Sequence, residues 1–373
     1  MGKVTREGAK RARAMLVVAM AACLPSSYVL AADGPKLTPA MRAAVVTHLE
    51  AELKSRYVFP DVAGHIATDL AANLKAGRYD QDVTTEAFAD HLSRDIRASG
   101  NDRHLMVQFA PKFRSPPAGD PPPPTKADLD EEQAWVDKDG AGIAAVRRLP
   151  GNIGYIDLRQ FPPADFVVPR YKAAMQLLAG SEGIIIDLRQ NLGGDPHAVA
   201  LLLSYFFREN DGRHLNDMYW RKDGSTDQFH TFPVDGQRLL APVYVLTSAR
   251  TFSAGEEAAY DFQTQKRGTL IGATTGGGAN PGGMFALSDG FIAFIPAGRA
   301  INPVTKTNWE HVGVKPDIEI APEKAFSTAY SKLIDLQLKA AKDPEEQDAL
   351  RKALGDADHV EAPVPDYTPF HHD

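Results

Sequence analysis

The amino-acid sequence predicts a mixed α/β protein in which a small helical domain precedes a core built on a mostly parallel sheet. Near the N-terminus, apolar residues recur at three- and four-residue spacings, as on the buried face of amphipathic helices. Further along, short apolar runs rich in β-branched residues alternate with helical stretches, which is the order that gives a parallel sheet. With 373 residues, 43% of them hydrophobic, the chain is long enough for two domains.

The N-terminal segment has the composition of a secretory signal peptide. Basic residues precede an apolar run from Met15 to Leu24, and Ala31 and Ala32 offer small residues for cleavage. The apolar run is too short to span a bilayer, and no other stretch approaches the length that a membrane-spanning helix needs. We therefore expect residues 1–32 to be removed on export, and the mature protein to be periplasmic or extracellular.

The only cysteine, Cys23, lies in this leader, so the mature chain is expected to carry no disulfide and no cysteine-based metal site. Lipid anchoring through Cys23 is the less favoured alternative, because Met20 and Leu24 depart from a lipoprotein cleavage box. Removing the leader takes away five basic residues and one acid, which changes the formal charge from −7 to −11. This acidic balance argues against nucleic acid or an anionic membrane as partner.

The chain divides by composition into consecutive segments. Residues 36–98 carry three amphipathic periods and form the helical N-terminal domain. Residues 99–139 begin with a connecting strand and continue as a Pro-rich linker, because clustered prolines exclude helix and central strand. Residues 140–342 form the α/β core, and residues 343–373 a C-terminal tail whose Pro-rich end is typical of disorder. His104 lies where the helical pattern gives way to alternation.

Function in parallel sheets collects at the carboxyl ends of strands, and two such ends carry informative residues. Gly193 and Gly194 follow the buried strand expected at 183–189. A glycine-rich turn there offers exposed N–H groups for an oxyanion, although such turns are more often simple connections.

Ser253 follows the second of these strands, expected at 243–246. A helix begins at Ala254, with acids in its first turn, so Ser253 lies at a strand-to-helix corner. Its hydroxyl would be exposed there, beside the N–H of Ala254, as a nucleophile requires. The structural alternative is that Ser253 only caps the helix. Beyond it, we expect residues 280–284 to form a mobile rim over the site, because of their proline and glycines.

Five motifs occur in order: DRHLMV, GNIGYIDL, IIIDLRQNLGG, LTSARTFSAGEE and NWEHVGVKPDI. Together they resemble the tail-specific (C-terminal processing) serine peptidase family, especially its interphotoreceptor retinoid-binding-protein-like and tricorn-like branch, over about residues 38–325. The resemblance implies a ClpP/crotonase-like core of repeated ββα units behind a small helical domain. It also implies serine peptidase activity on a peptide or protein. We expect no cofactor, and no metal because nothing in the sequence matches a metal-binding motif. The PDZ domain that many members insert has no room here.

The resemblance assigns a Ser-His-Glu triad. Ser253 matches the family nucleophile, His104 the general base and Glu310 the acid that orients it. The lysine of the Ser–Lys branch would fall at Gly278, so that dyad is absent. An imidazole titrates near neutrality and can accept the hydroxyl proton, while a carboxylate fixes its tautomer and stabilises the cation. Gly193, Gly194 and Ala254 are the expected oxyanion hole.

Two rival residues and two rival functions stay open. Glu256, in the first turn after Ser253, is the rival carboxylate, although acids there often only complement the helix dipole. His311 adjoins Glu310, but consecutive side chains of an extended segment point to opposite faces. A non-catalytic carrier of hydrophobic, retinoid- or lipid-like ligands on the same fold is the alternative function. Crotonase-like acyl-CoA chemistry is disfavoured by the acidic charge and the leader.

Overall fold

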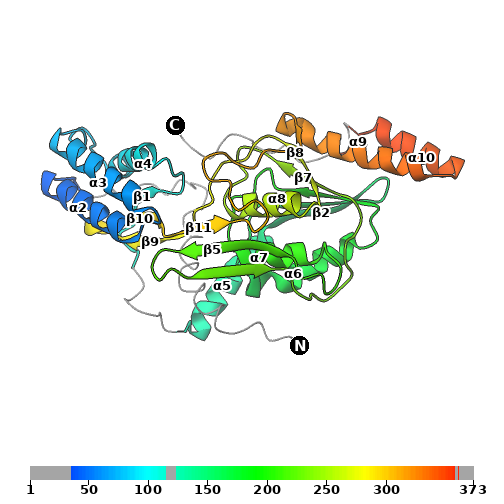
Figure 1. The fold of residues 1–373 in the computed structure, drawn as a ribbon, viewed down its shortest axis with the longest axis horizontal. Coiled ribbons are helices and arrows are strands. Elements are labelled where there is room, and N and C mark those ends of the chain that lie inside the picture. The colour runs from blue at the N-terminus through cyan, green and yellow to red at the C-terminus, as the bar shows by residue number, and fades with distance from the viewer. Residues whose placement is uncertain (1–34, 115–122, 358–359, 361–373) are drawn as a thin grey trace.

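The computed structural model describes residues 35–114, 123–357 and 360. The expected leader with Cys23, part of the Pro-rich linker and the end of the expected tail lie outside these ranges. The described residues have the mixed α/β architecture that the sequence predicts (Figure 1). None of their helices is both long enough and apolar enough to cross a membrane.

Three helices open the described chain: α2 (Pro39–Arg56), α3 (Pro60–Lys75) and α4 (Thr85–Gly100). Local signals fix where they begin. Proline starts α2 and α3, where its missing N–H costs nothing. The hydroxyls of Thr38 and Thr84 accept hydrogen bonds from first-turn N–H groups of α2 and α4. The apolar faces of the three helices pack together into one hydrophobic core.

A three-stranded antiparallel sheet completes this helical domain. Its order is β1 (Met106–Phe109), β10 (Phe291–Pro296) and β9 (Gly282–Ala286). Phe291, Ala293 and Ile295 are buried in the same core as the helices. Figure 1 shows the two late strands, in yellow, beside the blue helices. The small domain is therefore built from two chain segments that are far apart in the sequence.

This return of the chain corrects two expectations. The core is not one continuous stretch over residues 140–342, because residues 282–296 belong to the small domain. The expected mobile rim at 280–284 is also wrong: Asn280 is fully buried, and Gly282 begins β9, whose first three residues are buried. The glycines there serve close packing, since a Cβ on Gly282 would lie 2.3 Å from the Ile295 carbonyl oxygen.

The core contains a six-stranded sheet of order β12-β8-β7-β4-β3-β2, parallel throughout except that β2 is antiparallel to β3. The bounds are β2 (Ile143–Leu149), β3 (Ile153–Leu158), β4 (Gly183–Asp187), β7 (Val243–Thr247), β8 (Thr269–Gly272) and β12 (Ile318–Glu319). Side chains alternate along β4: Ile184 and Ile186 enter one apolar cluster, and Ile185 enters another. Both faces of the sheet are thus covered, as a parallel sheet requires.

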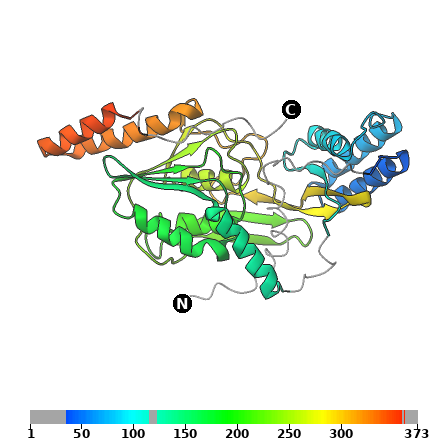
Figure 2. The same ribbon diagram turned by 180° about the vertical axis from the view of Figure 1, so that it is seen from behind.

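Helices cover the two faces separately. The first cluster includes residues of α5 (Lys126–Lys138), α6 (Ala164–Leu178), α7 (Pro196–Ser204) and α8 (Ala254–Thr264). The second includes residues of α9 (Pro322–Ala340) and α10 (Pro344–Gly355). A second antiparallel sheet, β11-β5-β6, accompanies α7 and α8; its strands are β5 (His214–Trp220), β6 (Thr226–His230) and β11 (Gly298–Ile301). Seen from behind, α9 and α10 lie at the end opposite the helical domain (Figure 2).

Two helices occupy segments expected to be irregular. Helix α5 lies within the expected linker and begins with a capping box, in which Thr125 and Asp128 bond each other's backbone N–H groups. Helix α10 lies within the expected tail, starts at Pro344 after the cap Asp343, and buries Leu350 against α9. Both helices are short and mostly polar, so their apolar periodicity is weak in the sequence.

Candidate active site

The loops that follow β4 and β7 meet because these strands are parallel neighbours. The Phe252 N–H donates to the Asn191 carbonyl oxygen at 2.9 Å, which joins the two loops directly. The Thr251 hydroxyl donates to the Leu188 carbonyl oxygen at 2.7 Å, and Ser248 donates to that of Arg189. Ser248 therefore has a structural role, while the next serine of the motif faces the junction of the loops.

Ser253 lies at the corner between β7 and α8, as expected. Its backbone has φ 54° and ψ −122°, a left-handed conformation that costs a non-glycine residue on the order of 1–3 kcal/mol. Gly193 is in contact with it: a Cβ on Gly193 would lie 2.7 Å from the Ser253 Cβ. The Gly193 backbone therefore packs directly against Ser253, with no space for a side chain between them.

The three expected oxyanion donors differ in their surroundings. The Gly193 N–H donates to the Asn191 Oδ1 at 2.9 Å, so it already has a partner inside the protein. The N–H groups of Gly194 and Ala254 have no acceptor among the described residues. Both residues line a pocket together with Ser253. Of the expected set, these two remain available to an incoming oxyanion.

His104 lies between α4 and β1, on the small domain, and its side chain is about 10% exposed. The imidazole packs against Phe252, the residue before the serine, with ring centroids 4.6 Å apart, and stacks on Phe294. Its Nδ1 has no hydrogen bond. Burial lowers the pKa of His104; Asp102 opposes this shift and Arg97 adds to it. The ring is thus kept neutral and ready to accept a proton.

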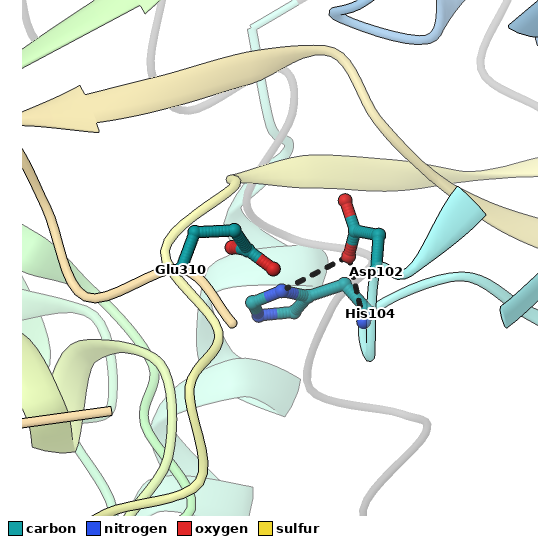
Figure 3. Close-up of side chains that lie close together, drawn as sticks. All are labelled: Asp102, His104 and Glu310. Atoms are coloured by element: carbon teal, nitrogen blue, oxygen red, sulfur yellow. Dashed lines mark hydrogen bonds and ion pairs between the residues drawn. The ribbon is translucent and has the colours of Figure 1, made fainter. Parts of the chain in front are cut away.

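Glu310 comes from the turn before β12 and faces His104, together with a third residue, Asp102 (Figure 3). One ligand atom from each of the three side chains lies within 4.8 Å of the other two. The Ala279 N–H donates to Glu310 Oε2, while Oε1 has no hydrogen bond. Burial and the nearby Asp102 raise the pKa of Glu310 to about 9, and the Ala279 N–H offsets part of the rise.

Asp102 has no role in the sequence-based prediction, although it stands in the same motif as His104. It is fully buried and lies with its Oδ1 3.8 Å from His104 Nδ1. Its carboxylate accepts hydrogen bonds from the Tyr57 hydroxyl at 3.0 Å, the Asn280 amide at 3.0 Å and the His104 N–H at 2.9 Å. The sequence did contain one signal for this contact: Asp102 stands two residues before His104, and an aspartate often accepts a hydrogen bond from the N–H of the residue two positions later.

Glu256 does not face the histidine. This fully buried carboxylate accepts the Ser253 N–H at 2.9 Å, the Thr275 hydroxyl at 2.5 Å, and the N–H groups of Gly277 and Gly278 at 2.6 and 2.8 Å. Burial raises the pKa of Glu256 to about 7, and these four hydrogen bonds offset part of the rise. Glu256 therefore fixes the 275–278 loop to the serine.

The 275–278 loop also separates the two halves of the site. A Cβ on Gly278 would lie 2.4 Å from the Phe252 ring and 2.6 Å from the His104 ring, so only glycine fits. A lysine at this position, as in the Ser–Lys branch, has no space. Both Ser253 and His104 are described in full, and no hydrogen bond joins them. Such bonds are often loose without substrate and tighten in the Michaelis complex.

His311 is placed differently from expectation. Glu310 and His311 form a turn in which His311 has φ 67°, so the alternation of an extended segment does not apply. The His311 Nδ1 lies 3.5 Å from the Glu310 Oε1, and its side chain is 40% exposed. It therefore approaches the same carboxyl group as His104, from the solvent side.

The arrangement is that of a hydrolase: a strained serine at a helix N-terminus, two free N–H groups, and a neutral histidine beside two carboxyl groups. Two family models match the chain: "Peptidase family S41" over residues 152–320, and "N-terminal domain of Peptidase_S41 in eukaryotic IRBP" over residues 35–137. The chain belongs to peptidase family S41, with an N-terminal domain like that of the retinoid-binding branch. This confirms the family that the five motifs indicate.

A curated relative is the carboxyl-terminal-processing protease of Synechocystis sp., 29% identical over 202 residues. The match covers 52% of this chain and 44% of the relative, so this chain aligns with less than half of that protein. Among solved structures, a lipoprotein from Streptococcus agalactiae has a TM-score of 0.51 at 15% identity, covering 80% of this chain and 98% of that one. Mature CPAF complexed with lactacystin has a TM-score of 0.53 at 10% identity, covering 84% and 99%. These two likenesses show the fold.

Proposed function

We propose that this chain is an exported serine peptidase that cleaves peptide or protein substrates through Ser253, His104 and Glu310. The observation that supports it best is the placement of His104, which is buried and neutral, with its Nδ1 facing two carboxyl groups and its ring against Phe252. A histidine used only for packing would need neither carboxyl group. The strained serine supplies the second half of the site.

The reaction follows from these residues. His104 takes the hydroxyl proton as Ser253 attacks the substrate carbonyl, and the imidazolium that forms is stabilised by Glu310 and Asp102. The carbonyl oxygen becomes an oxyanion, which the N–H groups of Gly194 and Ala254 are placed to receive. His104 then protonates the leaving amine as the peptide bond breaks. Water attacks the resulting ester while His104 takes its proton, and the bond from the acyl group to the Ser253 oxygen breaks as His104 returns that proton to Ser253.

Labelling with a fluorophosphonate tests this proposal. We expect the wild-type protein to be labelled at Ser253 and the Ser253→Ala variant to be unlabelled. Ser248→Ala is the matched control, because that serine lies five residues earlier and is bonded to the Arg189 carbonyl. Labelling that persists in Ser253→Ala would place the nucleophile elsewhere, and no labelling of wild type would favour the ligand-carrier alternative.

The same experiment should be run with a chelator. Asp102, His104 and Glu310 are a donor set that fits a divalent cation, with one imidazole nitrogen and two carboxylates. A serine mechanism requires that labelling and hydrolysis survive the chelator.

Export is the cellular part of the proposal and rests on the leader alone. We expect the exported protein to begin near Ala32 or Asp33, which its intact mass measures. A full-length chain retained in the cytoplasm would contradict export, and a diacylglyceryl adduct on Cys23 would show lipid anchoring instead.

A further inference from the structure

A pocket beside Ser253 is not used by the proposed triad. Ser253, Gly194 and Ala254 line it, so it adjoins both the nucleophile and the free N–H groups. The pocket has a cavity volume of about 50 Å³ and opens to solvent. Its walls are largely apolar and aromatic, with Met218, Trp220, Phe229 and Trp309 among them. A side chain next to the attacked carbonyl would have to enter this space.

The polar lining of this pocket is acidic. Of its two carboxyl groups, Asp227 is engaged, since its Oδ2 accepts the Trp220 indole N–H at 2.8 Å. Glu257, one helical turn after Ser253, is only 2% exposed, and no ion pair joins it to a lysine or arginine among the described residues. No lysine or arginine lines the described pocket either.

The surroundings of Glu257 disfavour its negative charge, which a cation in the pocket would stabilise. Burial raises the pKa of Glu257 to about 8; Asp195 adds to the rise, while Asn216 and His197 offset part of it. His197 is itself paired with Asp195, at 3.0 Å. The Asn216 side chain lies close enough to Glu257 to favour the charged form of the Glu257 carboxyl. Asn216 is fully buried, yet neither the nitrogen nor the oxygen of its side-chain amide makes a hydrogen bond of good geometry. Buried polar groups rarely lack every hydrogen-bond partner, whether that partner is protein, water or a ligand.

We infer that this pocket takes a lysine or arginine side chain of the substrate, at the residue whose carbonyl Ser253 attacks. The inference rests on the proposed function. The aromatic walls suit the methylene stem of such a side chain, while the Glu257 carboxylate can accept hydrogen bonds from its charged end. An apolar side chain would fill the space between the walls but leave Glu257 without a partner, and an acidic one would be repelled.

Peptidyl diphenyl phosphonates test the inference, because the residue that bears phosphorus is the one that must enter the pocket. Four probes differ only there and carry the side chain of lysine, arginine, norleucine or glutamate. Norleucine has a similar stem without the charge. We expect the two basic probes to inactivate wild type about 10- to 100-fold faster than the norleucine probe, as a charge-assisted hydrogen bond implies, and the glutamate probe to be slowest.

The Glu257→Gln variant should lose most of this preference, because an amide carries no charge to attract the basic end; a fluorophosphonate without any side chain measures whether Ser253 is still reactive in it. Asp227→Asn is the matched control and should keep the preference, because the Asp227 carboxylate already has a partner. Thermal unfolding reports whether each variant is folded. The relative inactivation rates of the four probes on the wild-type protein test the inference without any variant.

The possible results distinguish a failure of the pocket's proposed preference for basic side chains from a failure of the proposed peptidase function. If the fluorophosphonate labels wild type but the norleucine probe reacts as fast as the basic ones, the inference is wrong and the peptidase stands. If the preference is lost in Asp227→Asn but kept in Glu257→Gln, the assignment to Glu257 is wrong. If no probe labels Ser253, the proposed function fails and the inference fails with it.

Discussion

Replacing Ser253 or His104 by alanine should each lower kcat by about 10⁴–10⁶-fold, and the double variant should be hardly slower than either single one. The reason is that neither residue is useful without the other: the hydroxyl is a poor nucleophile until the imidazole takes its proton. Kinetics on a peptide substrate at neutral pH, for the wild type and these three variants, measure the effect. Non-additivity is the signature of one catalytic unit.

His311→Ala is the control for the histidine, because His311 also approaches Glu310, from the solvent side. We expect it to keep most of the activity. If His311→Ala loses most of its activity while His104→Ala stays active, His311 is the base and our assignment to His104 is wrong. Losses that simply multiply in the double variant would mean that Ser253 and His104 do not act on one proton.

Exchanging the carboxylates for amides should separate chemistry from structure. Measured near pH 9, where the Glu310 carboxyl gains its charge, Glu310→Gln should lower kcat by about 10²–10⁴-fold with little change in stability, because an amide can hold the imidazole but cannot stabilise its charge. Glu256→Gln should instead lower the free energy of unfolding by about 1.5–3 kcal/mol, because its new amide group faces N–H and O–H donors where a carboxylate oxygen accepted them. Denaturant titration and kinetics distinguish the two effects.

The dependence of kcat/KM on pH also tests the roles of His104 and Glu310. His104 must be neutral to act as base, and its lowered pKa places the acid limb of kcat/KM below the ordinary value for histidine. Glu310, with a pKa raised to about 9, gains its charge only as the pH rises. We therefore expect kcat/KM to increase again toward pH 9 in the wild type and to lack this second rise in Glu310→Gln. A catalytically normal Glu310→Gln beside an inactive, folded Glu256→Gln would reverse the assignment.

Much of the site could be predicted because its signals are local. The strand before Ser253, the acids after it and the glycines at 193–194 are each short patterns that the backbone obeys. The proposed base, His104, and the acid proposed to orient it, Glu310, lie far from Ser253 in the sequence and were reached through family motifs. The structure brings these two residues into one cluster. Ser253 makes no direct hydrogen bond to His104; the contact between the two parts of the site is that of the Phe252 ring with the His104 ring.

Other features had no local signal. The donors to the Asp102 carboxylate include Tyr57 and Asn280, which only the tertiary fold brings to it. Glu256 looked like a helix-dipole partner, since nothing in the first turn of a helix shows that a later loop will fold onto its carboxylate. The Gly193 N–H, one of three equivalent candidates in the sequence, is distinguished from the others by a side chain two residues earlier.

Because the small domain is built from two distant chain segments, the candidate site can assemble only late in synthesis. Strand β1 pairs with β10, with Met106 opposite Phe294, and Phe291 packs edge-on against Phe88 of α4. During synthesis the three helices must therefore wait for most of the core to be made before their exposed apolar face is covered. Contacts this distant slow folding. His104 is attached to β1, so it is held in position only late in folding, and an incomplete chain lacks the proposed base in its assembled position.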